Sequence, residues 1–118
     1  MRDIIRALKA LSDETRLRIL RLLLLQECCV CEVMQALDIS QTRASRNLAV
    51  LYDAGFLKLR KEGLWSMYSL DYENLKNYQL DLIEAVKKAT DGNSLVTQDE
   101  ERLRNADKTG PGCLVKSS

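Results

Sequence analysis

The sequence contains no histidine, and this absence excludes more chemistry than any other feature of its composition. Without imidazole, histidine-based catalytic triads, histidine-containing zinc sites and histidine proton shuttles are all ruled out. Proline occurs once and aromatic residues make up only 5% of the chain, which favours a helical domain over a sheet-rich one. The 118 residues suffice for one compact domain and are too few for two ordinary ones.

A large net charge and a long hydrophobic run are also missing. The 18 basic and 17 acidic residues give a formal net charge of +1, which argues against a uniformly basic nucleic-acid coat and against an acidic tail protein. Apolar runs such as Leu22 to Leu25 are too short to cross a bilayer. Because the chain opens into a helical pattern and not into an apolar signal core, we expect a soluble cytoplasmic protein with reduced thiols and no membrane partner.

The hydrophobic spacing predicts a mainly α-helical chain with one β-hairpin, in the order α-α-α-α-β-β-α. A second helix with almost no polar face is expected to lie at the centre of the core. Expected helices cover residues 3–11, about 13–25, 31–37, 41–54 and 72–89, and the hairpin strands cover 56–61 and 65–69. We expect residues 1–90 to form one domain and residues 91–118 to be a polar, disordered tail, with at most a short helical turn near residues 100–103.

The first and last predicted helices carry apolar stripes that favour a partner helix. On the last helix the stripe repeats at heptad-like spacing, and its simplest partner is the symmetry mate in a homodimer. The expected interface consists of Ile4, Ile5, Leu8, Leu75, Tyr78, Leu82, Ala85, Val86 and Ala89.

Two short helices joined by a three-residue turn at residues 38–40, the second with a polar outer face, predict a helix-turn-helix, and the hairpin makes it a winged one. Arg46 is the best candidate for a bidentate contact with guanine in the major groove, and cations on the hairpin suit phosphates. Residues 1–62 hold 11 basic and 8 acidic residues (+3), whereas residues 63–118 hold 7 and 9 (−2), so the basic excess lies in the half with the reading helix. The expected DNA-binding residues are Ser40, Gln41, Thr42, Arg43, Ser45, Arg46, Asn47, Lys58, Arg60 and Lys61.

Five segments, at residues 11–20, 29–32, 39–48, 51–57 and 61–65, together resemble the ArsR/SmtB family of metal-responsive repressors. The resemblance covers about residues 4 to 90. It implies a homodimeric winged-helix repressor that binds an imperfect palindrome in double-stranded DNA, with the first and last helices at the dimer interface. Asn47 departs from the family, which commonly has His there; an Asn side chain can still hydrogen-bond DNA.

Three of the four cysteines, Cys28, Cys29 and Cys31, lie within four residues at the expected start of the third helix. A helix N-terminus lowers the pKa of a thiol there, so we expect thiolates. Three soft thiolates without imidazole favour trivalent arsenic or antimony, because three sulfurs complete a pyramidal centre; Cd²⁺ and Pb²⁺ are alternatives. Packing alone accounts poorly for three thiols in so short a segment.

The resemblance sharpens this expectation. Cys29-Val30-Cys31 matches the arsenite-binding Cys-Val-Cys of the family, which usually has a third cysteine three residues later, where this chain has Met34. Cys28 is the favoured replacement for the third ligand, and Cys113 in the tail is the less favoured one. A two-thiolate site for methylated trivalent arsenic is a further alternative.

The sequence therefore predicts a repressor that releases its operator when arsenite binds the thiols and the third helix unwinds or tilts. A coupling free energy of roughly 1–3 kcal/mol would weaken DNA binding about 5- to 150-fold. The nearest alternative is a repressor whose thiols sense oxidants. A thiol enzyme or metalloid carrier is disfavoured because no Cys-x-x-Cys opens a βαβ unit and no general base accompanies the thiols, so we expect neither catalytic residues nor a catalytic cofactor.

Overall fold

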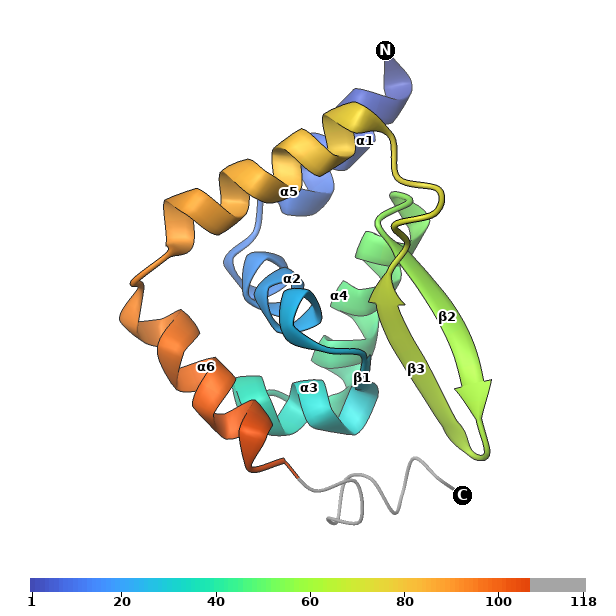
Figure 1. The fold of residues 1–118 in the computed structure, drawn as a ribbon. Coiled ribbons are helices and arrows are strands. Elements are labelled where there is room, and N and C mark those ends of the chain that lie inside the picture. Colours follow the sequence, from blue (N-terminus) through green and yellow to red (C-terminus); the bar gives the residue numbers. More distant parts are fainter. Residues whose placement is uncertain (107–118) are drawn as a thin grey trace.

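The computed structural model describes residues 1–106, and Cys113 lies outside these residues. Helices surround a core beside a small sheet at the edge of the molecule (Figure 1). The elements in chain order are α1 (Arg2–Leu11), α2 (Glu14–Leu25), β1 (Cys28–Cys29), α3 (Val30–Leu37), α4 (Gln41–Asp53), β2 (Leu57–Glu62), β3 (Trp65–Leu70), α5 (Asn77–Thr90) and α6 (Ser94–Arg104). Within this part of the chain, no helix is long and apolar enough to cross a membrane.

Side-chain caps fix where the central helices begin. Asp13 accepts a hydrogen bond from the Arg16 N–H at 3.0 Å and starts α2. Ser40 accepts from the Arg43 N–H at 3.1 Å and starts α4, as predicted. Gly55, with φ of 87°, follows α4 in a left-handed conformation that favours glycine.

The core confirms the expected central position of the second helix. Ile19, Leu20 and Leu22 of α2 are fully buried, and so are Leu48 and Leu51 on the inner face of α4. These side chains belong to one continuous apolar cluster that also takes in α1, α3 and Phe56.

The hairpin is present, but it belongs to a three-stranded antiparallel sheet with the order β1-β3-β2. Strand β1 was not predicted: it has only two residues, Cys28 paired with Tyr68 and Cys29 paired with Met67. The consequence is that two of the clustered cysteines, Cys28 and Cys29, lie in a strand that pairs with wing strand β3.

The expected disordered tail is wrong for residues 94–104, which form helix α6. Asn93 caps it by accepting from the N–H groups of Leu95 and Val96. Buried Asp99 on α6 then accepts two hydrogen bonds of 2.8 Å from the guanidinium of Arg18 on α2. Leu103 joins the main core. A helix with few apolar residues is thus fixed by distant contacts, the Arg18–Asp99 pair and the packing of Leu103, which local patterns do not reveal.

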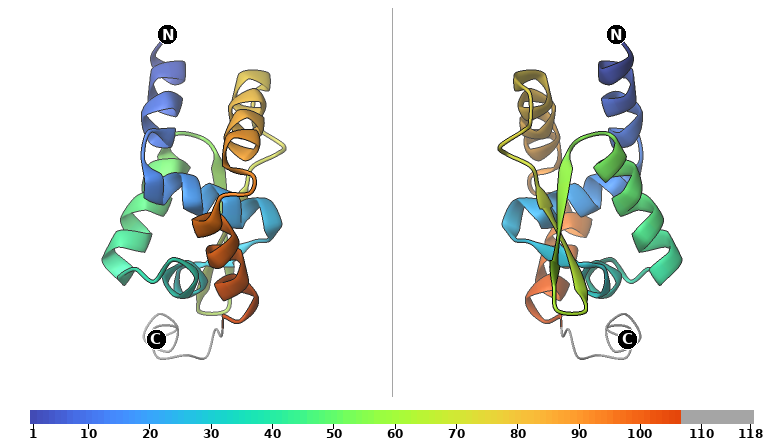
Figure 2. Two further views of the ribbon diagram at one scale, coloured as in Figure 1. Left: turned by 90° about the vertical axis from the view of Figure 1, so that its left-hand side faces the viewer. Right: turned by 90° about the vertical axis from the view of Figure 1, so that its right-hand side faces the viewer.

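The residues expected at a dimer interface are only partly exposed. Helix α5 begins at Asn77, five residues later than expected, so Leu75 precedes it. Leu75 and the apolar residues Tyr78, Leu82 and Val86 are half-buried against the core of the same chain. Ile5 and Leu8 on α1 are 44% and 49% exposed. Helices α1 and α5 project from the same end of the molecule (Figure 2). That a partner chain covers these residues stays a prediction.

Candidate nucleic-acid interface and thiol site

The outer face of α4 is polar and accessible. Thr42, Arg46, Ala49 and Asp53 follow one another at helical spacing on the side opposite buried Leu48, and all four are exposed. We call these four residues the reading face. Gln41, in the first turn, is exposed as well, and the hydroxyl of Ser40 is engaged in capping the helix.

Asn47 does not belong to this surface, and its expected contact with DNA stays a prediction. The residue is 8% exposed. Its amide donates to the Arg43 carbonyl at 2.9 Å, and its Oδ1 accepts from Nη1 of Arg16 at 3.0 Å. Arg43 is exposed, and its guanidinium donates to the Thr15 hydroxyl at 2.9 Å. Asn47 therefore holds α4 against α2.

Arg16 is the residue that the sequence analysis missed. Its Nε donates to the Ala10 carbonyl at 2.6 Å and its Nη2 to the Lys9 carbonyl at 3.2 Å, at the end of α1. Together with its contact to Asn47, this ties three helices together. No local signal distinguishes Arg16 from Arg18, which pairs with Asp99 instead.

The three cations expected on the wing do not share one face. Side chains of a strand alternate, so Lys58 and Arg60 lie on one side of β2 and Lys61 on the other. Arg60 pairs with Glu27 at 2.6 Å and with Glu62 at 2.8 Å, and these contacts, Glu27 first, raise the pKa of the guanidinium. Its expected phosphate contact stays a prediction, and that contact would have to replace these exposed ion pairs. Lys58 lies 3.5 Å from Glu73.

Lys61, in contrast, lies beside α4. A hollow of about 360 Å³ separates α4 from the wing, and we call it the wing hollow. It is lined by Cys29, Val30, Ser45, Lys61, Leu64, Trp65, Ser66 and Tyr68. Within it, Nζ of Lys61 donates to the Ser66 hydroxyl at 2.6 Å. Lys61 and Ser45 are thus the predicted wing and helix residues that the structure brings together.

The clustered cysteines divide between two environments. Cys28 and Cys29 are consecutive strand residues, so their side chains point to opposite sides of β1. Cys28 lies in the main core, and its Sγ contacts the Gln26 carbonyl oxygen at 3.6 Å. On the other side, the sulfurs of Cys29 and Cys31 are 2.9 Å apart and pack with Met67 and Trp65. We call Cys29 and Cys31 the thiol pair.

In this structure Cys28 does not face the thiol pair, so its role as the third ligand stays a prediction that this geometry does not favour. Among residues 1–106, no group of three Cys, His, Asp or Glu side chains could hold a metal ion. Two sulfurs bound to one centre at about 2.3 Å each must lie within about 4.6 Å of one another. The 2.9 Å separation of the thiol pair meets this limit. Cys28, on the opposite side of the strand, belongs to the packing.

The expected acidification of the thiols at the helix N-terminus is also wrong for Cys29. Burial raises the pKa of the Cys29 thiol, and the N–H groups of Glu32 and Cys31 oppose that shift only in part. The Glu32 carboxylate, which accepts from the Cys29 N–H at 2.9 Å, adds to the increase in pKa. At neutral pH the buried thiol therefore keeps its proton until a ligand displaces it.

Comparison with known proteins begins with a family model. Residues 13–59 match the model described as bacterial regulatory protein, arsR family. This segment holds α2, the thiol pair, α3, α4 and the first half of β2.

Curated relatives are similar over longer stretches. The chain is 39% identical over 100 residues to the arsenic resistance transcriptional regulator ArsR2 of Pseudomonas putida, with 84% of each chain covered. It is 51% identical over 67 residues to the arsenical resistance operon repressor of Escherichia coli K12, covering 56% of this chain and 57% of that one. It is 44% identical over 75 residues to a cadmium resistance regulatory protein CadC homolog of Staphylococcus aureus, covering 63% and 62%. The matches thus span less than two thirds of the latter two relatives.

Solved structures agree on the fold. The homodimeric winged helix-turn-helix domain Mb0332 of Mycobacterium bovis has a TM-score of 0.64 at 29% identity, covering 78% of this chain and 82% of that one. Reduced HlyU of Vibrio cholerae has a TM-score of 0.63 at 32% identity, covering 74% and 87%. The predicted winged helix-turn-helix is therefore confirmed.

Proposed function

Because the chain belongs to the arsR family of bacterial regulatory proteins, we propose that it is a homodimeric repressor that releases operator DNA when trivalent arsenic or antimony binds the thiol pair. The chain is a transcriptional regulator and not an enzyme. The observation that carries the effector is the 2.9 Å separation of the Cys29 and Cys31 sulfurs in a position next to both the wing and the helix-turn-helix. A regulator of operator DNA works in the cytoplasm, where thiols stay reduced.

The chemistry suits Cys29, whose buried thiol carries a proton, together with Cys31 in its reduced form. When arsenous acid condenses with a thiol, an As–S bond replaces an As–OH bond, and the thiol proton leaves with the hydroxide as water. Two such steps use the thiol pair. The third bond of the arsenic goes to Cys113, or to a methyl group when the effector is a methylated trivalent arsenic.

The position of the thiol pair supports a route to the DNA surface. Cys29 lies in β1, which pairs with wing strand β3, and Cys31 lies in the first turn of α3, the first helix of the helix-turn-helix. An arsenic or antimony atom bound to both sulfurs would link β1 to α3. In the proposed mechanism these two elements adjust separately when the free protein binds DNA. Adjusting α3 also moves α4, because only residues 38–40 join them.

The first test is a titration of duplex DNA, selected from a random pool by the reduced protein itself, with and without arsenite. We expect arsenite to weaken binding about 5- to 150-fold. Affinity for a scrambled duplex of the same length serves as the control, since it measures the sequence-independent share of binding. Unchanged operator affinity at saturating arsenite would overturn the effector assignment.

The second test identifies the ligands. X-ray absorption at the arsenic edge counts bound sulfurs in the unmodified protein, in Cys28→Ala and in Cys113→Ser. We expect Cys28→Ala to keep the sulfur count. A drop from three sulfurs to two in Cys113→Ser identifies Cys113 as a ligand, whereas a count of two in every form identifies a two-thiolate site. A sulfur lost in Cys28→Ala contradicts the proposal.

Oxidation of the same pair is the second candidate function, favoured by the short separation of the sulfurs. Hydrogen peroxide would take two electrons and two protons from the thiols, yielding a Cys29–Cys31 disulfide and two water molecules. Oxidant sensing is supported if peroxide releases DNA without arsenic and if the peptide that holds both cysteines loses the mass of two hydrogens. The cadmium-responsive alternative is favoured by similarity to the Staphylococcus aureus protein, and titration with Cd²⁺ tests it in the same assay.

A further inference from the structure

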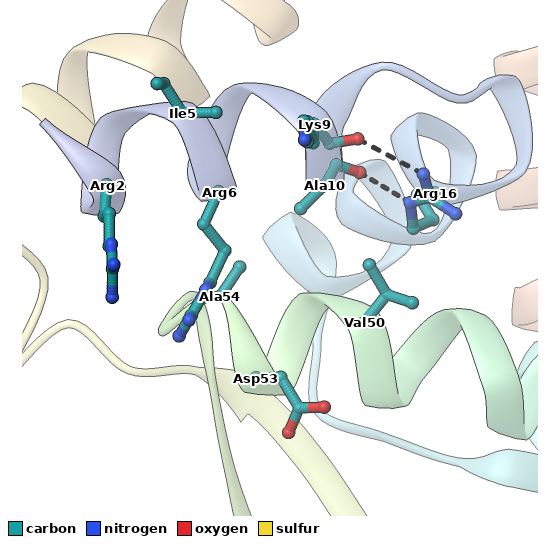
Figure 3. A pocket seen from close by; sticks show the side chains of 9 residues that line it. All are labelled: Arg2, Ile5, Arg6, Lys9, Ala10, Arg16, Val50, Asp53 and Ala54. Carbon is teal, nitrogen blue, oxygen red and sulfur yellow. Dashed lines mark hydrogen bonds between the residues drawn. The ribbon is translucent and has the colours of Figure 1, made fainter.

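A hollow of about 790 Å³ lies between α1 and the second half of α4, and we call it the α1 hollow (Figure 3). It is lined by Arg2, Ile5, Arg6, Lys9, Ala10, Arg16, Val50, Asp53 and Ala54. Four of these side chains are cationic and one is acidic, so the hollow is electropositive. The apolar stripe of α1 predicts a dimer interface, and the sequence pattern indicates no role for the cations of this helix.

Helix α1 presents three separate faces. Ala7, Ala10 and Leu11 are buried in the core. Ile5 and Leu8 form the exposed apolar face. Arg2, Arg6 and Lys9 recur at i, i+4 and i+7 and form the third face. Figure 3 shows Arg2 and Arg6 extending from α1 toward the end of α4, on the side away from Ile5. The cations therefore lie apart from the apolar residues expected to meet a partner chain.

These cations have no carboxylate partner. Among residues 1–106, no carboxylate lies within ion-pair distance of Arg2, Arg6, Lys9, Arg46 or Lys61. Six other cations are paired with carboxylates: Arg18, Arg21, Lys58, Arg60, Lys76 and Arg104. Unpaired positive charge therefore lies beside α4, on α1 and on the inner side of the wing, as well as on Lys87 and Lys88 of α5.

The α1 hollow is continuous with the reading face. Asp53 belongs to both, and Val50, one turn earlier on α4, lines the hollow. On its other side α4 borders the wing hollow through Ser45. The reading helix is therefore flanked by cations on both sides: Lys61 from the wing, and Arg2, Arg6 and Lys9 from α1.

We propose that Arg2, Arg6 and Lys9 bind the phosphate backbone of DNA and extend the contact surface from the reading helix onto α1. This inference rests on the DNA binding proposed above and adds to it a surface outside the helix-turn-helix and the wing. Two observations support this contact. The three cations are accessible and have no carboxylate partner, as phosphate binding requires, and the α1 hollow is continuous with the reading face. Phosphate contacts carry no sequence information, so α1 contributes affinity and not discrimination.

The test compares the double variant R6Q/K9Q with the unmodified protein. Binding to the selected duplex and to a scrambled duplex is measured at a series of salt concentrations. We expect R6Q/K9Q to bind both duplexes more weakly by the same factor. The slope of log K against log[salt] should become shallower by about 3.6, because a dimer loses four phosphate contacts of about 0.9 each. The control K88Q/R104Q removes two exposed cations from α5 and α6 and should leave the slope unchanged.

The outcomes separate this inference from the function on which it depends. If the unmodified protein binds neither duplex, the proposed function fails. If the unmodified protein binds and R6Q/K9Q shows the same affinity and slope, the role of α1 is overturned while repression stands. Sedimentation of R6Q/K9Q completes the design: a shift to monomer with an unchanged salt slope assigns the cations to the dimer interface and also overturns the proposal.

Discussion

The two sides of strand β1 hold chemically identical side chains in different surroundings. On the core side, Cys28 packs with the apolar cluster that also contains Leu103 of α6, the helix that the Arg18–Asp99 pair fixes. On the wing side, Cys29 lies 2.9 Å from the sulfur of Cys31 and borders a hollow shared with α4 and the wing. Substitutions on the core side should therefore lower stability without changing the response, and substitutions on the wing side should do the reverse.

The largest expected effect lies on the core side. Asp99→Ala leaves Arg18 without its partner, and the side chains of Arg18 and Asp99 are 14% and 2% exposed. We expect the free energy of unfolding to fall by about 2–3 kcal/mol, less than for a fully buried pair because Arg18 reaches solvent. Urea denaturation measures it. The control is Asp91→Ala: Asp91 is 59% exposed and pairs with Arg21, so its loss should cost less than about 1 kcal/mol.

The next effect lies on the wing side. Cys29→Ser and Cys31→Ser should each abolish the release of DNA by arsenite, which removes a coupling of roughly 1–3 kcal/mol. Cys28→Ala is the matched control and should respond as the unmodified protein does. Operator titrations with and without arsenite measure all three variants. A response that survives in Cys29→Ser and disappears in Cys28→Ala would reverse the assignment of the two sides.

Cys28→Ala should also be less stable than the unmodified protein. Cys28 is fully buried in the main cluster, and replacing its sulfur by hydrogen leaves a small cavity there. We expect Cys28→Ala to lower the free energy of unfolding by about 1–2 kcal/mol, below the usual range for larger apolar side chains. Urea denaturation of Cys28→Ala and of the unmodified protein gives the difference. If Cys28→Ala is as stable as the unmodified protein, neighbouring side chains fill the cavity. The contrast between the two sides of β1 would then rest only on the release of DNA by arsenite.

The smallest effect concerns pH. Because burial raises the pKa of Cys29 in the folded protein, the unfolded chain releases this proton first as pH rises. The stabilising contribution is complete below the ordinary thiol pKa of about 8.5 and is lost as pH rises through the higher folded value, by at most about 1.4 kcal/mol per pH unit. Denaturation curves between about pH 7 and pH 10 should therefore decline more steeply for the unmodified protein than for Cys29→Ser. Parallel declines would contradict the raised pKa.

Local patterns predicted the elements that local chemistry fixes. The cap at Ser40, the glycine after α4 and the apolar inner face of α4 are properties of neighbouring residues, and the structure has them where the sequence indicates. The polar reading face follows from the same helical spacing. The parts that failed depend on partners far along the chain, such as Asp99, which binds an arginine 81 residues away.

The thiol site shows the same limit at short range. A two-residue strand is too short for alternation to be read, so Cys28 and Cys29 look equivalent in sequence although β1 places them on opposite sides. The pKa of Cys29 could not be predicted either, because the helix N-terminus is visible in the sequence and the burial is not. Likewise, nothing near Asn47 in the sequence indicates that Arg16 occupies its amide oxygen.

The Arg16 contacts have a practical consequence for exchanging DNA specificity between relatives. Gln41, Thr42 and Arg46 are exposed, and none donates a hydrogen bond to another helix within residues 1–106. The side chains at these three positions can therefore be exchanged without breaking a hydrogen bond between helices. Arg43 and Asn47 are bonded to Thr15 and Arg16 of α2, so a transplanted α4 must bring the matching residues of α2 with it. In a chimera that lacks these matching residues, the transplanted helix would be held at the wrong angle. The operator preference of the donor protein would then not be transferred.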